Sequence, residues 1–179
     1  MSASSPPKKT KVLFVCLGNI CRSPLGEIIL RAMAFDRKQL DLFEIDSCGT
    51  SAYHIGETPD HRSVEVSHLN ISKSISEEAY QHFKSIPLHK ARQLCIEDFS
   101  KYDYIFAMDD SNLNNIKSLK GHRSSNAVIT RLGTYHTHKK LNVEDPYYGT
   151  LKDFHICYNH IHDCLTNFLK DIDQKETNK

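Results

Sequence analysis

The amino-acid sequence predicts a single α/β domain in which a four-stranded parallel sheet carries helices on both faces. Short apolar segments alternate along the chain with longer segments whose apolar residues recur at helical spacing, and this alternation is typical of a parallel sheet. A tight loop joins the first apolar segment to the first helical one. The length of 179 residues suits one domain with a substantial core.

The first predicted strand is Val12–Val15, whose four consecutive apolar residues are typical of a strand buried on both faces. Ser23 is a favourable N-cap and Pro24 a favourable first helical residue, so the first helix is expected to begin at Pro24 and end near Phe35. Helical spacing supports this range at Leu25, Ile28, Ile29 and Ala32.

The later elements continue the same alternation. In chain order they are a strand at Leu42–Asp46, a helix at Asp60–Leu69, a strand at Tyr102–Met108, a helix opening at Ser111, a strand at Ala127–Leu132 and a helix at Leu151–Ile172. The last helix has the longest apolar stripe, which is expected to pack on the sheet: Phe154, Cys157, Tyr158, Ile161, Cys164, Leu165 and Phe168.

The composition excludes several classes of protein. The chain has 23 Lys and Arg against 22 Asp and Glu, and this balance of +1 argues against nucleic-acid binding. It has no apolar run of the roughly 20 residues that a bilayer requires. The first ten residues lack the apolar core of a signal peptide, and Ser2 stands where myristoylation needs glycine. We therefore expect a disordered lead-in over 1–10, a cytoplasmic location, no membrane association and a monomer.

The loop after the first strand carries the chemistry. We call residues 16–22 the cysteine loop; Cys16 and Arg22 lie six positions apart at its two ends. Gly18 and Asn19 tolerate left-handed backbone, so the loop can curl back and point its N–H groups at an oxyanion. These amides, the helix dipole and Arg22 favour the Cys16 thiolate. The Arg22 fork can bind two phosphate oxygens, and Ser23 can donate to the sulfur.

Residues 16–24, Cys-Leu-Gly-Asn-Ile-Cys-Arg-Ser-Pro, resemble the signature loop of the low-molecular-weight protein tyrosine phosphatases. Four further segments resemble that family in the same order: Asp46–Ser51, His89–Gln93, Met108–Asn112 and Asp145–Gly149. The similarity runs from about Lys11 to about Lys170. It implies the family's fold, with the active site at the carboxyl ends of the strands, and hydrolysis of phosphotyrosine or small aryl phosphates.

The resemblance also implies the roles of individual residues. Cys16 is the expected nucleophile, Arg22 the phosphate ligand and Asp145 the general acid, which then serves as the base. The rest of the cysteine loop is expected to bind substrate, with aromatic walls beside it: Leu17, Gly18, Asn19, Ile20, Cys21 and Ser23 in or next to the loop, and Tyr53, Tyr147 and Tyr148 as the walls. A supporting set is expected at Ser47, His89 and Asp109.

The six cysteines are expected to be free thiols, because the chain has no secretory signal and is large enough for a core. Cys21 can trap an oxidised Cys16 as a reversible disulfide, which the family's second loop cysteine also implies. The eleven histidines include His136, His138, His155, His160 and His162, but these lack a ligand spacing and are expected to be solvated. No metal and no cofactor is expected.

Residues 70–88 depart from the family pattern and are interpreted as a solvated surface insertion, in preference to a partner-binding element. A short helix is expected to open at Ser74–Glu78 and to end before Pro87. The domain is accordingly placed at 11–173, followed by a tail at 174–179.

Two other functions stay open. Arsenate reduction uses the same loop in one branch of this fold, but needs relay cysteines, for which Cys157 and Cys164 are the candidates. A non-catalytic phosphate-binding module is the third reading, although such a module does not need Cys16, Arg22 and Asp145 together.

Overall fold

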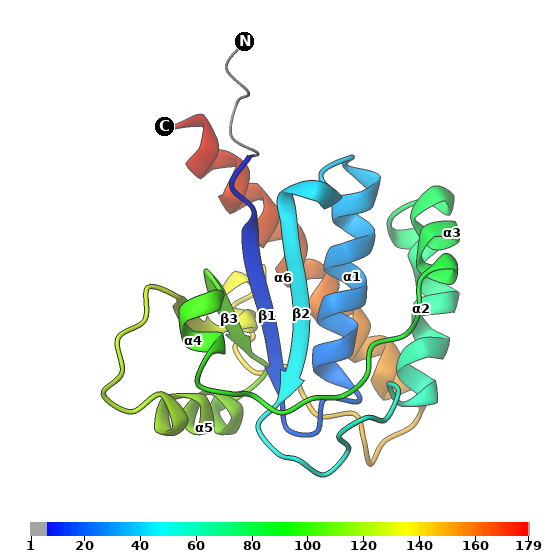
Figure 1. Ribbon diagram of the computed structural model, residues 1–179. Coiled ribbons are helices and arrows are strands. Elements are labelled where there is room, and N and C mark those ends of the chain that lie inside the picture. The colour runs from blue at the N-terminus through cyan, green and yellow to red at the C-terminus, as the bar shows by residue number, and fades with distance from the viewer. Residues whose placement is uncertain (1–6, 179) are drawn as a thin grey trace.

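The computed structural model describes residues 7–178, so most of the expected lead-in lies outside the described part of the chain. Within that range the centre is a parallel sheet in the order β2-β1-β3-β4 (Figure 1). The strands are β1 (Thr10–Cys16), β2 (Phe43–Gly49), β3 (Tyr104–Ala107) and β4 (Val128–Arg131). The predicted fold class is confirmed.

Helices cover both faces of this sheet (Figure 1). They are α1 (Arg22–Asp36), α2 (His61–Ser74), α3 (Glu77–Ser85), α4 (Asp98–Lys101), α5 (Asp110–Lys120) and α6 (Leu151–Thr177), with short 3₁₀ turns η1 (Leu40–Leu42) and η2 (Leu132–Tyr135). No helix in the described range 7–178 is both long and apolar enough to cross a bilayer.

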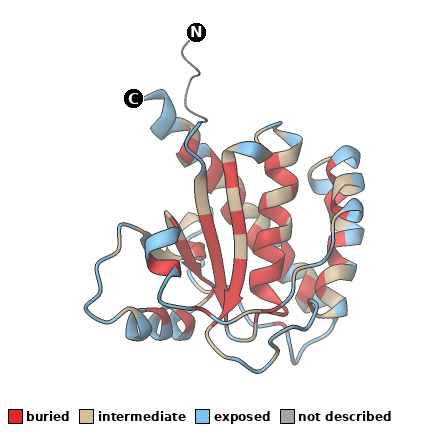
Figure 2. Cartoon of the chain, in the orientation of Figure 1, coloured by how far each residue is buried: buried red, intermediate tan, exposed pale blue. Residues whose placement is uncertain are grey.

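The side chains of β1 alternate between two cores, which is why Val12–Val15 are apolar at every position. Val12 and Phe14 belong to the large core that α1, α2, α3 and α6 complete, while Leu13 and Val15 belong to a smaller core beneath α4 and α5. Figure 2 shows β1 and its neighbour β2 largely buried. Helix α1 approaches β1 closely, since a Cβ on Gly26 would lie 2.6 Å from the Phe14 ring.

Helix α1 begins two residues earlier than predicted, and the N-cap assignment of Ser23 is wrong. Cys21 occupies the N-cap position without a side-chain cap hydrogen bond. Ser23 lies inside the first turn and is fully buried. Its hydroxyl is therefore free to serve the cysteine loop instead of the helix end.

The interpretation of 70–88 as a solvated insertion is wrong in its burial, although the short helix is present. Ser76 caps α3, where its hydroxyl accepts from the Ala79 N–H at 3.1 Å. Ile71, Ala79 and Phe83 are buried in the large core. The segment therefore completes that core, and the apolar residues at its helical spacing were the signal for this.

The carboxyl terminus also differs from the prediction. Helix α6 continues to Thr177 instead of ending at Ile172, so most of the expected tail is helical. Its first turn is fixed by Thr150 and Asp153, which form a reciprocal capping box. All the residues of the predicted apolar stripe of α6 are buried, as expected.

Candidate active site

The cysteine loop surrounds the sulfur of Cys16 at the carboxyl end of β1. Cys16 is only 3 % exposed, and the Asn19 backbone N–H donates to its Sγ atom at 3.3 Å. The Ser23 hydroxyl lies 3.0 Å from the same Sγ. These donors and the amino end of α1 stabilise negative charge on the sulfur, which is what a thiolate nucleophile requires.

The predicted turn comes from Asn19 alone. Asn19 has a φ of 57°, in the left-handed region, whereas Gly18 has no positive φ. Gly18 is needed for a different reason, because a Cβ at this position would lie 2.9 Å from the His54 ring. The end of β2 also approaches the loop closely: a Cβ on Gly49 would lie 2.6 Å from the Leu17 carbonyl oxygen. Both glycines therefore give the loop room.

A buried hydrogen-bond network fixes the Asn19 side chain behind the loop. Its amide nitrogen donates to Ser23 Oγ at 2.8 Å and to Ser47 Oγ at 3.0 Å. Its carbonyl oxygen accepts from His89 Nε2 at 2.8 Å and from the Arg92 N–H at 3.0 Å. Every polar group of this nearly inaccessible amide is thus satisfied, which makes the network rigid.

Two carboxylates extend the network on its far side. Ser47 donates to Glu27 Oε2 at 2.7 Å, and His89 Nδ1 lies 3.2 Å from the same oxygen and 3.6 Å from Asp46 Oδ1. Glu27, Asp46 and His89 are close enough to share a metal ion. However, Arg31 also contacts Glu27 and Arg92 contacts Asp46, so charged partners already satisfy these groups. We therefore assign them to support of the loop.

Arg22 is buried between two carboxylates at the other end of the loop. Its Nη1 donates to Asp109 Oδ2 at 2.6 Å and to the Val143 carbonyl at 3.0 Å, and its Nη2 lies 3.4 Å from Asp145 Oδ2. Burial acts to lower the pKa of Arg22, but Cys16, Asp109 and Asp145 outweigh it and raise the pKa. The guanidinium therefore stays charged beside the sulfur.

A cavity of about 250 Å³ opens over the loop. Every residue predicted to act in catalysis or binding lines it except Asn19 and Ser23, which lie behind the loop: the lining is Cys16, Leu17, Gly18, Ile20, Cys21, Arg22, Tyr53, His54, Asp145, Tyr147 and Tyr148. Tyr53 and Tyr148 are highly exposed, whereas Tyr147 is 39 % exposed and meets Tyr148 edge to face. Of the supporting set, Ser47 and His89 hold Asn19, and Asp109 holds Arg22.

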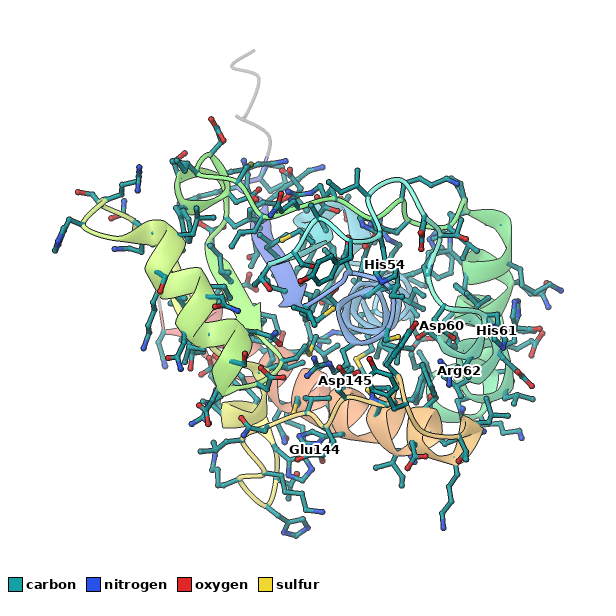
Figure 3. The ribbon with its side chains drawn as sticks, turned by 90° about the horizontal axis from the view of Figure 1, so that it is seen from below. His54, Asp60, His61, Arg62, Glu144 and Asp145 are labelled. Atoms are coloured by element: carbon teal, nitrogen blue, oxygen red, sulfur yellow. The ribbon has the colours of Figure 1, made fainter. Side chains whose placement is uncertain are left out.

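The sequence analysis missed His54, Asp60 and Arg62. In Figure 3 all three lie around the end of α1, which is seen end-on with Asp145 below it, whereas Glu144 and His61 point outward. His54 lines the cavity and pairs with Glu57 at 2.8 Å. For these three residues the sequence held one signal, an Asp before a predicted helix, which is a favourable N-cap. In the structure Asp60 is the N-cap of α2.

The remaining cysteines lie in apolar surroundings, apart from the exposed Cys95. Burial, and secondarily the nearby Asp60 carboxylate, raises the pKa of the Cys21 thiol far above its ordinary value. Burial also raises the pKa of Cys157 and of Cys164 to about 12. The thiols of Cys21, Cys157 and Cys164 therefore stay protonated at neutral pH and are poor nucleophiles.

One prediction about the histidines is wrong. His136 is buried, and its ring lies 4.4 Å from the ring of His160, centre to centre. The His160 Nε2 atom contacts the Lys140 carbonyl at 2.9 Å, and Asp163 lies 3.7 Å from His136. This pair packs the segment after η2 against α6, so His136 has a structural position and is not solvated.

Enzymes that hydrolyse phosphate esters with a cysteine nucleophile are the class that this fold and this loop define, because the loop gathers oxyanion donors around a stabilised sulfur. Comparison with known proteins narrows the class. The sequence model of the family described as low molecular weight phosphotyrosine protein phosphatase matches residues 11–178.

Relatives and solved structures agree with that match. A low molecular weight phosphotyrosine protein phosphatase of Dictyostelium discoideum is 62 % identical over 177 residues, covering 97 % of this chain and 98 % of the relative. The Sus scrofa protein of that name is 40 % identical, with coverage of 90 % and 94 %. The chain belongs to the low-molecular-weight protein tyrosine phosphatase family, and it is a protein tyrosine phosphatase.

Two solved structures show the same fold. A protein tyrosine phosphatase from Entamoeba histolytica superimposes with a TM-score of 0.78 at 29 % identity, covering 94 % of this chain and 99 % of that one. A Drosophila arginine phosphatase superimposes with a TM-score of 0.73 at 30 % identity, covering 91 % and 98 %.

Proposed function

We propose that the enzyme hydrolyses phosphotyrosine in proteins, and small aryl phosphate esters, with Cys16 as nucleophile, Arg22 as phosphate ligand and Asp145 as general acid and base. The observation that carries the proposal is that these three side chains line one cavity of about 250 Å³. Their charges also suit the reaction, since a cation lies beside the sulfur and a carboxyl group faces the opening of the cavity.

The first step forms a cysteinyl phosphate. The Cys16 thiolate attacks phosphorus, an S–P bond forms, and the bond from phosphorus to the tyrosine oxygen breaks. Asp145 donates its proton to that oxygen, so that a neutral phenol leaves. Arg22 and the loop amides bind the three remaining oxygens, and Asp109 holds the Arg22 fork in place.

The second step releases phosphate. The Asp145 carboxylate takes a proton from water, the water oxygen bonds to phosphorus, and the S–P bond breaks with its electron pair returning to sulfur. Ser23 lies 3.0 Å from Sγ and stabilises the departing thiolate by donating its hydroxyl proton. The two steps together consume one water and regenerate both groups.

Aromatic side chains at the opening favour a phenyl phosphate substrate. Tyr53, Tyr147 and Tyr148 offer three rings around the cavity, against which a flat phenyl ring can stack. The sulfur lies at the buried end, so the substrate must be long enough to reach it. The phosphate of phosphotyrosine lies further from the peptide backbone than the phosphate of phosphoserine, so it can reach the sulfur.

Relay cysteines for arsenate reduction are poorly placed. Cys157 and Cys164 are buried inside α6, and their pKa values are raised by that burial. A relay needs accessible thiols that exchange with the first cysteine. A non-catalytic binding module is also disfavoured, because binding alone gives no reason to place Asp145 at the opening of the cavity.

The deciding experiment measures hydrolysis of p-nitrophenyl phosphate and of a phosphotyrosine peptide in EDTA. We expect Cys16→Ser to abolish turnover of both substrates and Asp145→Asn to lower kcat/KM for the phosphotyrosine peptide by about 10²- to 10⁴-fold. Cys95→Ser is the matched control, because Cys95 is an exposed thiol outside the cavity and its loss leaves turnover unchanged. Absence of turnover in reduced, well-folded wild type would overturn the proposal.

The same assay separates the alternatives. The assay must also include a phosphoarginine substrate, because one similar structure is of an arginine phosphatase. Arsenate turnover that depends on added thiol and exceeds the phosphatase efficiency would indicate a reductase. Acid phosphatase activity, a monomeric state and a cytoplasmic location complete the proposal; assays at acid pH, light scattering and a fluorescent fusion test them in turn.

A further inference from the structure

The general acid sits on an exposed turn. We call residues 145–149 the acid loop. Within it the Tyr147 N–H donates to Asp145 Oδ1 at 3.2 Å, and the Gly149 N–H donates to the Pro146 carbonyl at 2.9 Å. These bonds shape the loop internally, but they do not fix its distance from the sulfur. A carboxyl group must be within hydrogen-bond reach of the leaving oxygen to protonate it.

Two arginines tie this loop to the body of the protein: Arg22 lies 3.4 Å from the Asp145 carboxylate, and Arg62 binds the backbone that follows Asp145. Arg62, in the first turn of α2, donates from Nη2 to the Tyr147 carbonyl at 3.0 Å and from Nη1 to the Gly149 carbonyl at 3.1 Å. The two carbonyls lie on the carboxyl side of Asp145. The Arg62 guanidinium therefore binds two backbone carbonyls, those of Tyr147 and Gly149, in the turn that follows Asp145.

Arg62 is itself held rigidly. Asp60 accepts from its Nε at 3.0 Å and from its Nη2 at 2.9 Å, and the guanidinium lies 4.4 Å from the Phe154 ring centre. Burial acts to raise the pKa of Asp60, but the hydrogen bonds from Arg62 outweigh it and lower the pKa. The pair is therefore fully charged at neutral pH, and charge-assisted contacts of this kind are short and directional.

The other end of this connection reaches the cysteine loop. The Asp60 N–H donates to the Ile20 carbonyl at 2.7 Å, and the Ser63 hydroxyl donates to the Cys21 carbonyl at 3.2 Å. The amino end of α2 thus contacts the loop that holds the nucleophile, while Arg62 contacts the loop that holds the acid. Figure 3 shows Asp60 and Arg62 on one side of the end of α1 and Asp145 below it.

We propose that Arg62 is a positioning residue for the general acid: through Asp60 and two backbone carbonyls it fixes the acid loop at a set distance from the cysteine loop. The inference rests on the proposed role of Asp145. A lysine cannot replace Arg62, because one ammonium cannot address Asp60 and two diverging carbonyls in the same plane. Arg62 touches no substrate; it acts on proton transfer alone.

The test compares esters that need the acid to different degrees. p-Nitrophenol leaves as a stable anion and needs little protonation, whereas phenol needs much more. In Arg62→Gln we expect kcat/KM for p-nitrophenyl phosphate to fall by about threefold or less and that for phenyl phosphate by about 10²-fold, since a misplacement near 1 Å costs that much. The alkaline decline of kcat/KM, which reports loss of the acid's proton, flattens in the variant.

Two further variants guard against a folding artefact. Arg62→Lys keeps the charge and one hydrogen bond, so its ester discrimination falls between those of wild type and Arg62→Gln. Arg37→Gln is the matched control: Arg37 forms a two-pronged pair with Asp173 at 2.6 Å, at the far end of α1 from the site. Its loss lowers the melting temperature without changing the ratio of the two esters.

The results separate the possible failures. An equal loss for both esters in Arg62→Gln, with an unchanged pH profile, would make Arg62 structural and overturn the inference. Equal activity of Asp145→Asn and wild type on phenyl phosphate would instead overturn the role of Asp145. In a double variant of Arg62→Gln and Asp145→Asn, the two losses do not multiply, because both remove the same proton transfer.

Discussion

The Asn19 side chain provides the most demanding test of how the cysteine loop keeps its shape. Asn19→Ala removes four hydrogen bonds, to Ser23, Ser47, His89 and the Arg92 N–H, and leaves an alanine at a φ of 57°. Each hydrogen bond contributes about 0.5–1.5 kcal/mol net, and left-handed backbone costs a residue with a Cβ about 1–2 kcal/mol. Together these losses predict a fall of about 3–8 kcal/mol in the free energy of unfolding.

Asn19→Gly separates the two contributions. Glycine loses the same hydrogen bonds but adopts the left-handed region freely, while its more flexible unfolded state costs about 0.4–1 kcal/mol. We therefore expect Asn19→Gly to be more stable than Asn19→Ala by about 0.5–1 kcal/mol. Urea unfolding followed by circular dichroism measures both, and in either variant kcat/KM falls by about 10²-fold because the loop shifts.

Two results would refute this reasoning. If both variants lose less than about 1 kcal/mol, the network does not stabilise the fold, since even two net hydrogen bonds exceed that value. If Asn19→Ala is the more stable of the two, the positive φ carries no strain. Unchanged kcat/KM in a destabilised variant would show that the loop keeps its shape without Asn19.

Three further predictions follow from the site and its surroundings. Ser23→Ala removes the hydroxyl that lies 3.0 Å from the Cys16 sulfur, so we expect kcat to fall by about 10- to 100-fold while kcat/KM changes less. Cysteinyl phosphate then accumulates and gives a burst of p-nitrophenol, and absence of a burst contradicts this prediction. Peroxide inactivation of wild type is reversed by thiols, whereas Cys21→Ser recovers poorly; equal recovery in both rules out the protective disulfide. Burial, and then the neighbouring His136, lowers the pKa of His160 below 6.5, so the unfolded chain binds a proton that the folded one does not. The stability contributed by the neutral His160 ring is complete above pH 6.5 and is lost as the pH falls below that value. In urea unfolding from pH 7 to 5, the free energy of unfolding of His160→Gln therefore declines less steeply than that of wild type. Parallel declines contradict the assignment.

The fold and the chemistry of the site could be predicted from the sequence because both are encoded locally. The four apolar residues before Cys16 and the positions of the strands along the chain follow from patterns within a few residues. The loop is likewise one continuous segment, so Cys16 and Arg22 are placed by their spacing. Asp145 came only from the resemblance to a family, since Asp-Pro is an ordinary turn sequence.

The wrong predictions have a common physical cause, which is that tertiary contacts decided against a local preference. Ser23 is a good N-cap by type, yet Asn19 and Cys16 engage its hydroxyl. His136 is polar, yet it packs against the ring of His160, 24 positions away in the sequence. Arg62 and the Tyr147 carbonyl lie 85 positions apart in the sequence, so no local pattern could join them.

The buried amide of Asn19 makes the enzyme sensitive to inhibition by its own product. Contacts within the protein give the loop its shape, so folding and not the substrate builds the phosphate-shaped cradle. That cradle addresses the phosphoryl group, which is common to the ester and to the free phosphate released from it. Inorganic phosphate must therefore compete for the same site, and turnover slows wherever the product accumulates.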